Sequence, residues 1–171
     1  MGKIYLYTGN GAGKTTNALG LALRALGHGQ KVVILQFLKW QKDTGEMLFK
    51  HPNYSIYQFG REGWHGFKNI TDEDRLCILR GLLALTTIMH MPYSPDLLIL
   101  DEINLAAHLK LINEDSVLRD LRRWMRLYPN MNIVMTGRHA TKTLINKADF
   151  VNEIVEIKAP KNFVCEKGIQ W

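Results

Sequence analysis

Short apolar runs alternate along the chain with stretches of helical periodicity. The run at Lys31–Phe37 is apolar almost without interruption, which is typical of a strand in a parallel sheet that is covered on both faces. The pattern predicts strands at Ile4–Tyr7, Lys31–Phe37, Tyr54–Phe59, Asp96–Asp101, Met131–Thr136 and Val151–Ile157.

Helical spacing of apolar residues fills the gaps between these runs. Leu19, Leu23 and Leu26 indicate a helix, and Gly27–Gly29 supplies residues suited to its left-handed cap. A capping box begins at Thr71 and indicates the start of a long helix. The pattern predicts helices at Asn17–Leu26, Glu46–Lys50, Thr71–His90, Ile103–Leu111, Glu114–Leu127 and Thr141–Ala148. Because strands and helices alternate, we expect an α/β fold with one domain over residues 1–171.

The first strand runs directly into a glycine-rich loop. Gly9, Gly11 and Gly13 allow the backbone to turn its N–H groups inward around an anion, and the following helix adds the positive end of its dipole. Lys14 brings a full positive charge to the phosphates, and the Thr15 hydroxyl can ligate Mg²⁺. Compared with G-x-x-x-x-G-K-[ST], this loop is one residue short. It predicts a triphosphate site, with a plain strand-to-helix connection as the alternative.

Charged residues also follow two of the later strands. The strand Asp96–Asp101 ends in a carboxylate that Glu102 follows, at the edge where α/β proteins bind ligands. Together with the glycine loop this is a Walker-B pattern, in which Asp101 and Glu102 can hold or orient Mg²⁺ opposite Thr15. Arg138 comes just past the next strand and can pair with phosphate.

The loop between residues 60 and 69 combines glycines with Trp64, His65 and Phe67. Aromatic side chains in such a loop suit a flat ligand. The alternative is that Trp64 and Phe67 fold back onto the core and anchor the loop. The sequence leaves these two readings open.

The composition limits which classes of partner and which cellular compartment the sequence favours. The 22 lysines and arginines outnumber the 16 acidic residues, and the net charge of +6 favours nucleotide, anionic cofactor or nucleic acid. The arginines of Glu114–Leu127 are interpreted as a solvated helix face. Cys77 and Cys165 lie far apart, which argues against a disulfide scaffold and favours the cytoplasm. Without a signal peptide or an apolar stretch of membrane-spanning length, no membrane partner is expected.

Several of these segments together resemble one family. The segments T-G-N-G-A-G-K-T-T, G-H-G-Q-K-V-V-I-L-Q-F-L-K, L-L-I-L-D-E-I and M-T-G-R are similar to those of the ATP:corrinoid adenosyltransferases of the phosphate-loop type, and the shortened loop is that family's own variant. The resemblance implies a single-domain three-layer α/β/α P-loop NTPase fold with a RecA-like, mostly parallel sheet. It also implies Mg²⁺ with ATP and a homodimer.

The activity that the resemblance implies uses cobalt as the nucleophile. A Co(I) corrinoid (cobalamin, cobinamide or cobyrinic acid a,c-diamide) attacks the 5′ carbon of ATP, and inorganic triphosphate leaves. The Co(I) form is made from bound Co(II) by a reductant such as a reduced flavoprotein. The protein then has to position the reacting atoms and neutralise the leaving triphosphate.

The family's functional residues map onto positions of this chain. Lys14, Thr15 and Glu102 would be catalytic, and Thr15, Asp101 and Glu102 would serve the metal. The residues expected to bind ATP or the corrinoid are Gly9, Asn10, Gly11, Ala12, Gly13, Lys14, Thr15, Thr16, Arg24, Arg138, Trp64 and Phe67. Ala12 stands where the family commonly has a lysine, and the family's F-T-W pattern is not reproduced around Trp64.

Two other functions fit the same loop. One is a P-loop ATPase or small-molecule kinase, in which Glu102 orients a water or an acceptor and the γ-phosphate is cleaved. The other is a non-catalytic, nucleotide-dependent binding protein. No RNA-binding or helix-turn-helix signature is present, so a nucleic-acid partner is not expected.

Overall fold

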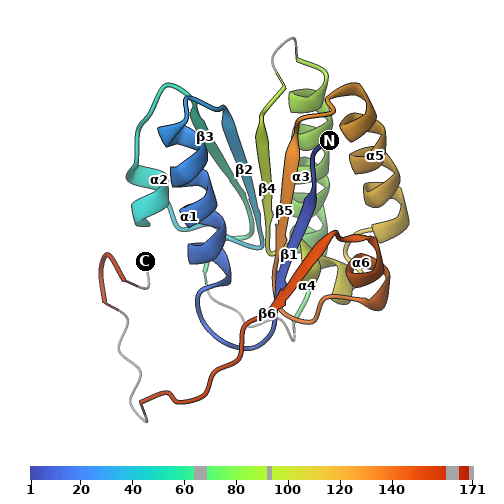
Figure 1. The fold of residues 1–171 in the computed structure, drawn as a ribbon. Helices are drawn as coiled ribbons and strands as arrows, with labels where there is room; N and C mark the ends of the chain where they lie inside the picture. Colours follow the sequence, from blue (N-terminus) through green and yellow to red (C-terminus); the bar gives the residue numbers. More distant parts are fainter. Residues whose placement is uncertain (64–68, 92–93, 161–165, 170–171) are drawn as a thin grey trace.

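Six parallel strands form one sheet in the computed structural model, which describes residues 1–63, 69–91, 94–160 and 166–169. The strands are β1 (Ile4–Thr8), β2 (Val32–Phe37), β3 (Tyr54–Phe59), β4 (Leu97–Asp101), β5 (Asn132–Thr136) and β6 (Phe150–Glu153). Their order in the sheet is β3-β2-β4-β5-β1-β6, and every neighbouring pair is parallel. All strands therefore end at the same edge, which is the lower edge in Figure 1.

Helices cover both faces of this sheet. They are α1 (Lys14–Gly27), α2 (Gly45–Leu48), α3 (Asp72–Met89), α4 (Ile103–His108), α5 (Glu114–Leu127) and α6 (Lys142–Lys147). Figure 1 shows α1 and α2 on one side of the sheet and α3, α4, α5 and α6 on the other. The α/β fold with a parallel sheet between helix layers is confirmed.

Alternate residues of the strands supply two separate cores. On β4, Leu98 and Leu100 face the core shared with α3, α4, α5 and α6, whereas Leu97 and Ile99 face the core shared with α1. Successive strand side chains point to opposite faces, so both sets of leucine and isoleucine are buried. This explains why the apolar strand runs in the sequence are continuous rather than alternating.

Helix α1 packs differently from its sequence pattern. The leucines at positions 19, 23 and 26 predicted the helix, but Leu23 is 67% exposed. The face that contacts the sheet consists mainly of Ala18, Ala22 and Ala25. Small side chains let the helix axis approach the strands closely, and this keeps the start of α1 directly above the carboxyl edge of the sheet.

Most of the predicted boundaries agree with the structure. The β3 and α5 ranges are as predicted, and Thr71 forms the predicted capping box at the start of α3. At the predicted cap of α1, Gly29 has the left-handed φ of 71°, and its N–H donates to the Leu26 carbonyl at 2.9 Å. Lys110, with φ 55°, follows the end of α4 at His108 and explains why that helix stops before the predicted Leu111.

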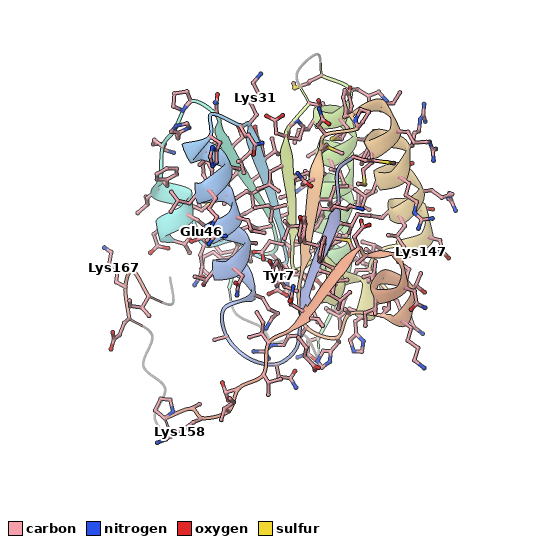
Figure 2. The ribbon with its side chains drawn as sticks, in the orientation of Figure 1. Tyr7, Lys31, Glu46, Lys147, Lys158 and Lys167 are labelled. Carbon is pink, nitrogen blue, oxygen red and sulfur yellow. The ribbon has the colours of Figure 1, made fainter. Side chains whose placement is uncertain are left out.

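The prediction that the last strand covers Val151–Ile157 is wrong at both ends. Strand β6 pairs with β1 from Tyr5 to Thr8 and ends at Glu153, because β1 turns into the glycine loop after Thr8 and offers no further partner. Beyond β6, the described residues Lys158 and Lys167 lie away from the sheet and its helices (Figure 2). Over the part of the chain that the structure describes, we find no helix with the length and apolar character needed to cross a membrane.

Candidate active site

The glycine loop between β1 and α1 is built by close backbone packing. Gly9 and Gly13 have φ values of 96° and 103°, a region that favours glycine. The Gly11 N–H donates to the Ile154 carbonyl at 2.8 Å, and a Cβ on Gly11 would lie 2.9 Å from that oxygen. The first and third glycines thus provide the turn, and Gly11 provides room for the chain that leaves β6.

Lys14 is the first residue of α1 and is only 7% exposed. Its Nζ donates to the Gly11 carbonyl oxygen at 2.6 Å, so the ammonium lies inside its own loop. Burial lowers the pKa of Lys14, whereas the nearby Glu102 carboxylate raises it and Arg138 lowers it further. A poorly solvated ammonium at a helix N-terminus is well placed to bind an anion.

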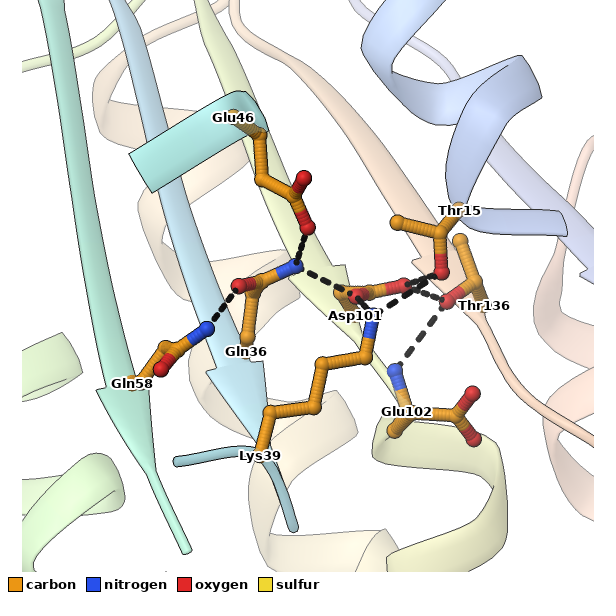
Figure 3. Close-up of polar contacts among 8 residues, drawn as sticks. All are labelled: Thr15, Gln36, Lys39, Glu46, Gln58, Asp101, Glu102 and Thr136. Atoms are coloured by element: carbon orange, nitrogen blue, oxygen red, sulfur yellow. Dashed lines mark hydrogen bonds and ion pairs between the residues drawn. The ribbon is translucent and has the colours of Figure 1, made fainter. Parts of the chain in front are cut away.

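Asp101, at the end of β4, is the centre of the polar network in Figure 3 and is 1% exposed. Its Oδ1 accepts from the hydroxyls of Thr15 and Thr136 at 2.9 and 2.5 Å. Its Oδ2 accepts from Gln36 Nε2 at 3.0 Å and from Lys39 Nζ at 2.7 Å. Four donors fill the acceptor positions of the carboxylate. Burial alone would raise the pKa of Asp101, but the Lys39 charge and these hydrogen bonds hold that pKa below its usual range.

Glu102 has a different environment although it is the next residue. It takes the left-handed φ of 61°, and its N–H donates to Thr136 Oγ1 at 3.0 Å, which turns the side chain away from the Asp101 network. Among the residues that the structure describes, its buried Oε2 has no hydrogen-bond partner. Burial first, and then the charge of Asp101, raise the pKa of Glu102.

Gly137 makes room for this carboxylate. A Cβ at Gly137 would lie 3.2 Å from Glu102 Oε2 and 2.9 Å from the backbone nitrogen of Leu105, and the φ of Gly137 is 133°. The buried Asn104 ties the same region together, because its Nδ2 donates to the carbonyls of Tyr7 and Gly137 at 3.1 and 3.3 Å. The ends of β1 and β5 are therefore fixed relative to Glu102.

These oxygen atoms fit a hard divalent cation such as Mg²⁺. Glu102 Oε2 is a buried carboxylate oxygen without a partner among the described residues, and the Thr15 hydroxyl lies at the same edge of the sheet. That Asp101 holds or orients the metal stays a prediction. Its four hydrogen bonds suit it to orienting Thr15 rather than to offering a free oxygen.

The remaining predicted loop and arginine positions are exposed. Asn10, Ala12 and Thr16 lie at the surface of the loop and of the first turn of α1. Arg24, also on α1, borders a hollow of about 340 Å³ that the loop residue Gly13 reaches as well. The other residues of this hollow are Tyr7, Thr16, Asn17, Gly20 and Leu21.

Arg138 lies on the other side of the loop and follows Gly137. It is exposed, and its charge acts on both Lys14 and Glu102. The structure therefore brings Lys14, Thr15, Asp101, Glu102 and Arg138 to one edge of the sheet. Arg24 lies near the other end of α1 and also borders a hollow with Leu97 and Asn132, which begin β4 and β5, so it is toward the opposite edge of the sheet. Figure 2 labels Tyr7, near the end of β1.

Trp64 and Phe67 lie outside the described residues, so the aromatic-loop prediction stays a prediction. Residues that precede that loop in the chain line a hollow of about 880 Å³ along β3. Its lining includes Trp40, Tyr57 and Phe59 together with the loop residue Glu62. An apolar, aromatic surface of this size thus adjoins the loop in the chain.

Sequence reasoning missed three residues of the network. Lys39 follows the buried strand β2, and Thr136 ends the buried strand β5, both at the same edge of the sheet as Asp101. A polar residue at the end of a buried strand was the signal that indicated Asp101, and it applies to these two residues as well. Gln36 interrupts an otherwise apolar strand and is fully buried. A polar residue inside an apolar run is a usable signal because such a group needs a buried partner.

Comparisons with known proteins agree with this geometry. The family model described as "ATP:corrinoid adenosyltransferase BtuR/CobO/CobP" matches residues 1–171. A corrinoid adenosyltransferase of Pseudomonas aeruginosa is 34% identical over 99% of this chain and 84% of its own length. Proteins of the same description from Sinorhizobium sp and Escherichia coli K12 are 32% and 29% identical, over 99% and 92% of this chain and 80% and 78% of their own lengths. The chain belongs to the ATP:corrinoid adenosyltransferase family.

Proposed function

We propose that this protein transfers the 5′-deoxyadenosyl group of ATP to the Co(I) of a corrinoid and releases inorganic triphosphate. In this step the cobalt electron pair forms a Co–C5′ bond, the C5′–O5′ bond breaks, and the triphosphate leaves with that electron pair. The observation that carries the proposal is the match to the family over the whole chain, joined to a buried cationic loop beside a carboxylate with an unpaired oxygen.

Lys14 stabilises the leaving triphosphate in this proposal. Its ammonium contacts a neutral carbonyl, that of Gly11. An anionic phosphate oxygen is a stronger acceptor for a charged donor than a neutral carbonyl is. Exchange of one for the other favours the state in which negative charge has collected on the leaving group, which lowers the barrier to transfer.

Thr15 and Glu102 would hold the Mg²⁺ that accompanies ATP, and this ion supplies charge neutralisation for the phosphates. Asp101 fixes the Thr15 hydroxyl through the 2.9 Å bond between them. Arg138 adds a positive charge at the same edge, and Arg24 is proposed to contact the nucleotide from α1. The Asn10–Thr16 segment, with Ala12 at its tip, would wrap the triphosphate.

Trp64 and Phe67 are proposed to contact the corrin ring. The aromatic hollow along β3 supports this, because a large planar ring with apolar faces needs an extended apolar surface. A reductant such as a reduced flavoprotein, a homodimeric assembly and a cytoplasmic location complete the proposal. The corrinoid would be cobalamin, cobinamide or cobyrinic acid a,c-diamide.

Product analysis tests the reaction against its alternatives. The protein is incubated with Mg·ATP and a chemically reduced Co(I) corrinoid, and phosphate products are separated by anion exchange. We expect triphosphate and a light-sensitive adenosylcorrinoid in equal amounts, with neither formed when the corrinoid is omitted. ADP and phosphate as main products would indicate a phosphohydrolase, and unchanged ATP would indicate a binding protein.

A further inference from the structure

Lys39 reaches Thr15, a proposed metal ligand, and Asp101, which orients Thr15. It lies after β2, and its Nζ is 2.7 Å from Asp101 Oδ2 and 3.1 Å from Thr15 Oγ1. The Lys39 side chain is 28% exposed, so its stem is largely covered by protein. Figure 3 shows the ammonium entering the network from the side of β2, between Thr15 and Asp101.

This position conflicts with a divalent cation on the same oxygen. A ligand of Mg²⁺ lies about 2.0–2.1 Å from the ion, so an ion on Thr15 Oγ1 would stand within a few ångströms of the Lys39 ammonium. Two cations at that separation repel each other strongly where solvent is largely excluded. A metal ion on Thr15 Oγ1 and the Lys39 ammonium on the same oxygen therefore disfavour each other.

We propose that Lys39 is a resident cation that occupies one ligand oxygen of the metal, Thr15 Oγ1, before ATP binds and withdraws from it when Mg²⁺ enters with ATP. Before that, its charge keeps Asp101 ionised and holds Thr15 close to it. The inference rests on the proposed binding of Mg²⁺ with ATP at this loop, but it does not depend on which group accepts the adenosyl moiety.

The backbone around Lys39 confines this movement to the side chain. Leu38 has the left-handed φ of 59°, and its N–H donates to the Phe59 carbonyl at 2.8 Å. Gly60 packs so closely that a Cβ there would lie 2.5 Å from the Lys39 backbone nitrogen. The main chain is thus fixed against the end of β3, while the flexible lysine stem can swing.

A withdrawn ammonium would still have acidic neighbours. Glu102 and Glu46 both act electrostatically on Lys39 in addition to Asp101. Glu46 lies on α2, and its Oε1 accepts from Gln36 Nε2 at 3.2 Å, next to the hydrogen bond between Gln36 and Asp101. Leaving Asp101 therefore does not move the Lys39 charge into an apolar region.

Mn²⁺ binding to the nucleotide-free protein tests this competition without any turnover. Free Mn²⁺ is measured by electron paramagnetic resonance during titration of the wild type, K39M and K42M. K42M is the matched control, because Lys42 is an exposed lysine nearby and its loss changes the net charge by the same amount. We expect K39M to bind Mn²⁺ at least about tenfold more tightly than the wild type, and K42M to match the wild type.

Three outcomes overturn the proposal: unchanged affinity in K39M, weaker affinity in K39M, or an equal gain in both variants. If K39M unfolds without metal, Mn²⁺ should restore its folding, and the wild type then supplies the deciding measurement. Its Lys39 ¹³Cε signal, assigned with K39R, should shift with Mg·ATP and not with ATP in EDTA. The same shift in both conditions, or in neither, refutes the displacement. Adenosyl transfer is measured separately, so a failed reaction and a failed displacement remain distinguishable.

Discussion

Replacement of Asp101 by asparagine removes one charge from the centre of the site and leaves the side-chain shape unchanged. The carboxylate is 1% exposed and pairs with Lys39 at 2.7 Å. Breaking a buried ion pair by removal of one partner costs about 3–5 kcal/mol. Lys39 is 28% exposed and can regain some solvation, so we place the loss for D101N at about 2–3 kcal/mol.

The hydrogen bonds change this figure little, because the amide can adapt. Its oxygen can replace Oδ2 and accept from Gln36 and Lys39, while its NH₂ group donates to the hydroxyls of Thr15 and Thr136. These hydroxyls can rotate and act as acceptors. The expected cost is therefore mainly the lost charge attraction.

Urea unfolding at pH 7 measures this cost, and a thermal scan should show a drop of about 4–12 °C in Tm. D149N is the matched control, since Asp149 pairs with Lys3 at 3.3 Å with both side chains substantially exposed, and such pairs contribute about 1 kcal/mol or less. A loss in D101N no larger than that in D149N would refute the assignment of Asp101 as the buried anchor of the site.

The pH dependence gives an independent check. The pKa of Asp101 is lowered in the folded state, so its contribution is fully present above the unfolded value of about 3.9 and is lost as pH falls through the folded pKa. The stability gap between the wild type and D101N should therefore be constant from pH 7 to about pH 4 and shrink below that. A gap that is the same at pH 3 as at pH 7 would contradict the ion-pair origin.

Four further variants test the loop, the aromatic segment and the packing. K14A should abolish adenosyl transfer, measured as triphosphate formed from Mg·ATP and Co(I) corrinoid, because Lys14 is proposed to neutralise the leaving group; near-normal turnover would contradict this. W64A should impair reduction of the bound Co(II) corrinoid, followed by its absorption spectrum, more than it impairs ATP binding, and equal losses would indicate a structural role for Trp64. G81A should lose about 1–2 kcal/mol in urea unfolding, since its Cβ would lie 2.6 Å from Phe37 Cε1. G20A, with no atom within 4 Å of its Cβ, should gain about 0.5–1 kcal/mol from helix propensity, and equal effects at Gly81 and Gly20 would refute the packing argument.

Sequence periodicity predicted the α/β class and most element boundaries because strand burial and helix capping are local properties. Tyr54–Phe59 carries its strand signal within its own residues, and Thr71 carries its cap. The end of β6 was predicted poorly because it is set by where β1 stops, a contact between residues far apart in the chain. The exposed Leu23 has the same kind of cause, since the distance of α1 from the sheet decides which helix face is buried.

The residues of the candidate site also fall into two groups, those indicated by a local pattern and those that depend on contacts far apart in the chain. Lys14 and Thr15 belong to a loop whose spacing is visible in one segment, and Asp101 ends an obvious strand. Lys39 and Thr136 enter the site only through the order of strands in the sheet, which places the ends of β2 and β5 on either side of β4. Their places at strand ends are visible in the sequence, but no local pattern states the strand order, so their contacts with Asp101 required the structure.

The charge arrangement explains how a buried aspartate can stand beside a site for a polyanion. The Asp101 carboxylate accepts hydrogen bonds from four donors, of which Lys39 is charged. Its negative charge is therefore largely compensated and repels incoming phosphates only weakly. Lys14 is held back by a neutral carbonyl, and its lowered pKa reflects charge that lacks solvation. In triphosphate release, negative charge grows on the leaving group, and a poorly solvated ammonium gains most from that growth. Asp101 is held by four donors, whereas Lys14 contacts a neutral carbonyl. We therefore expect the positive charge of Lys14 to act mainly on the departing triphosphate.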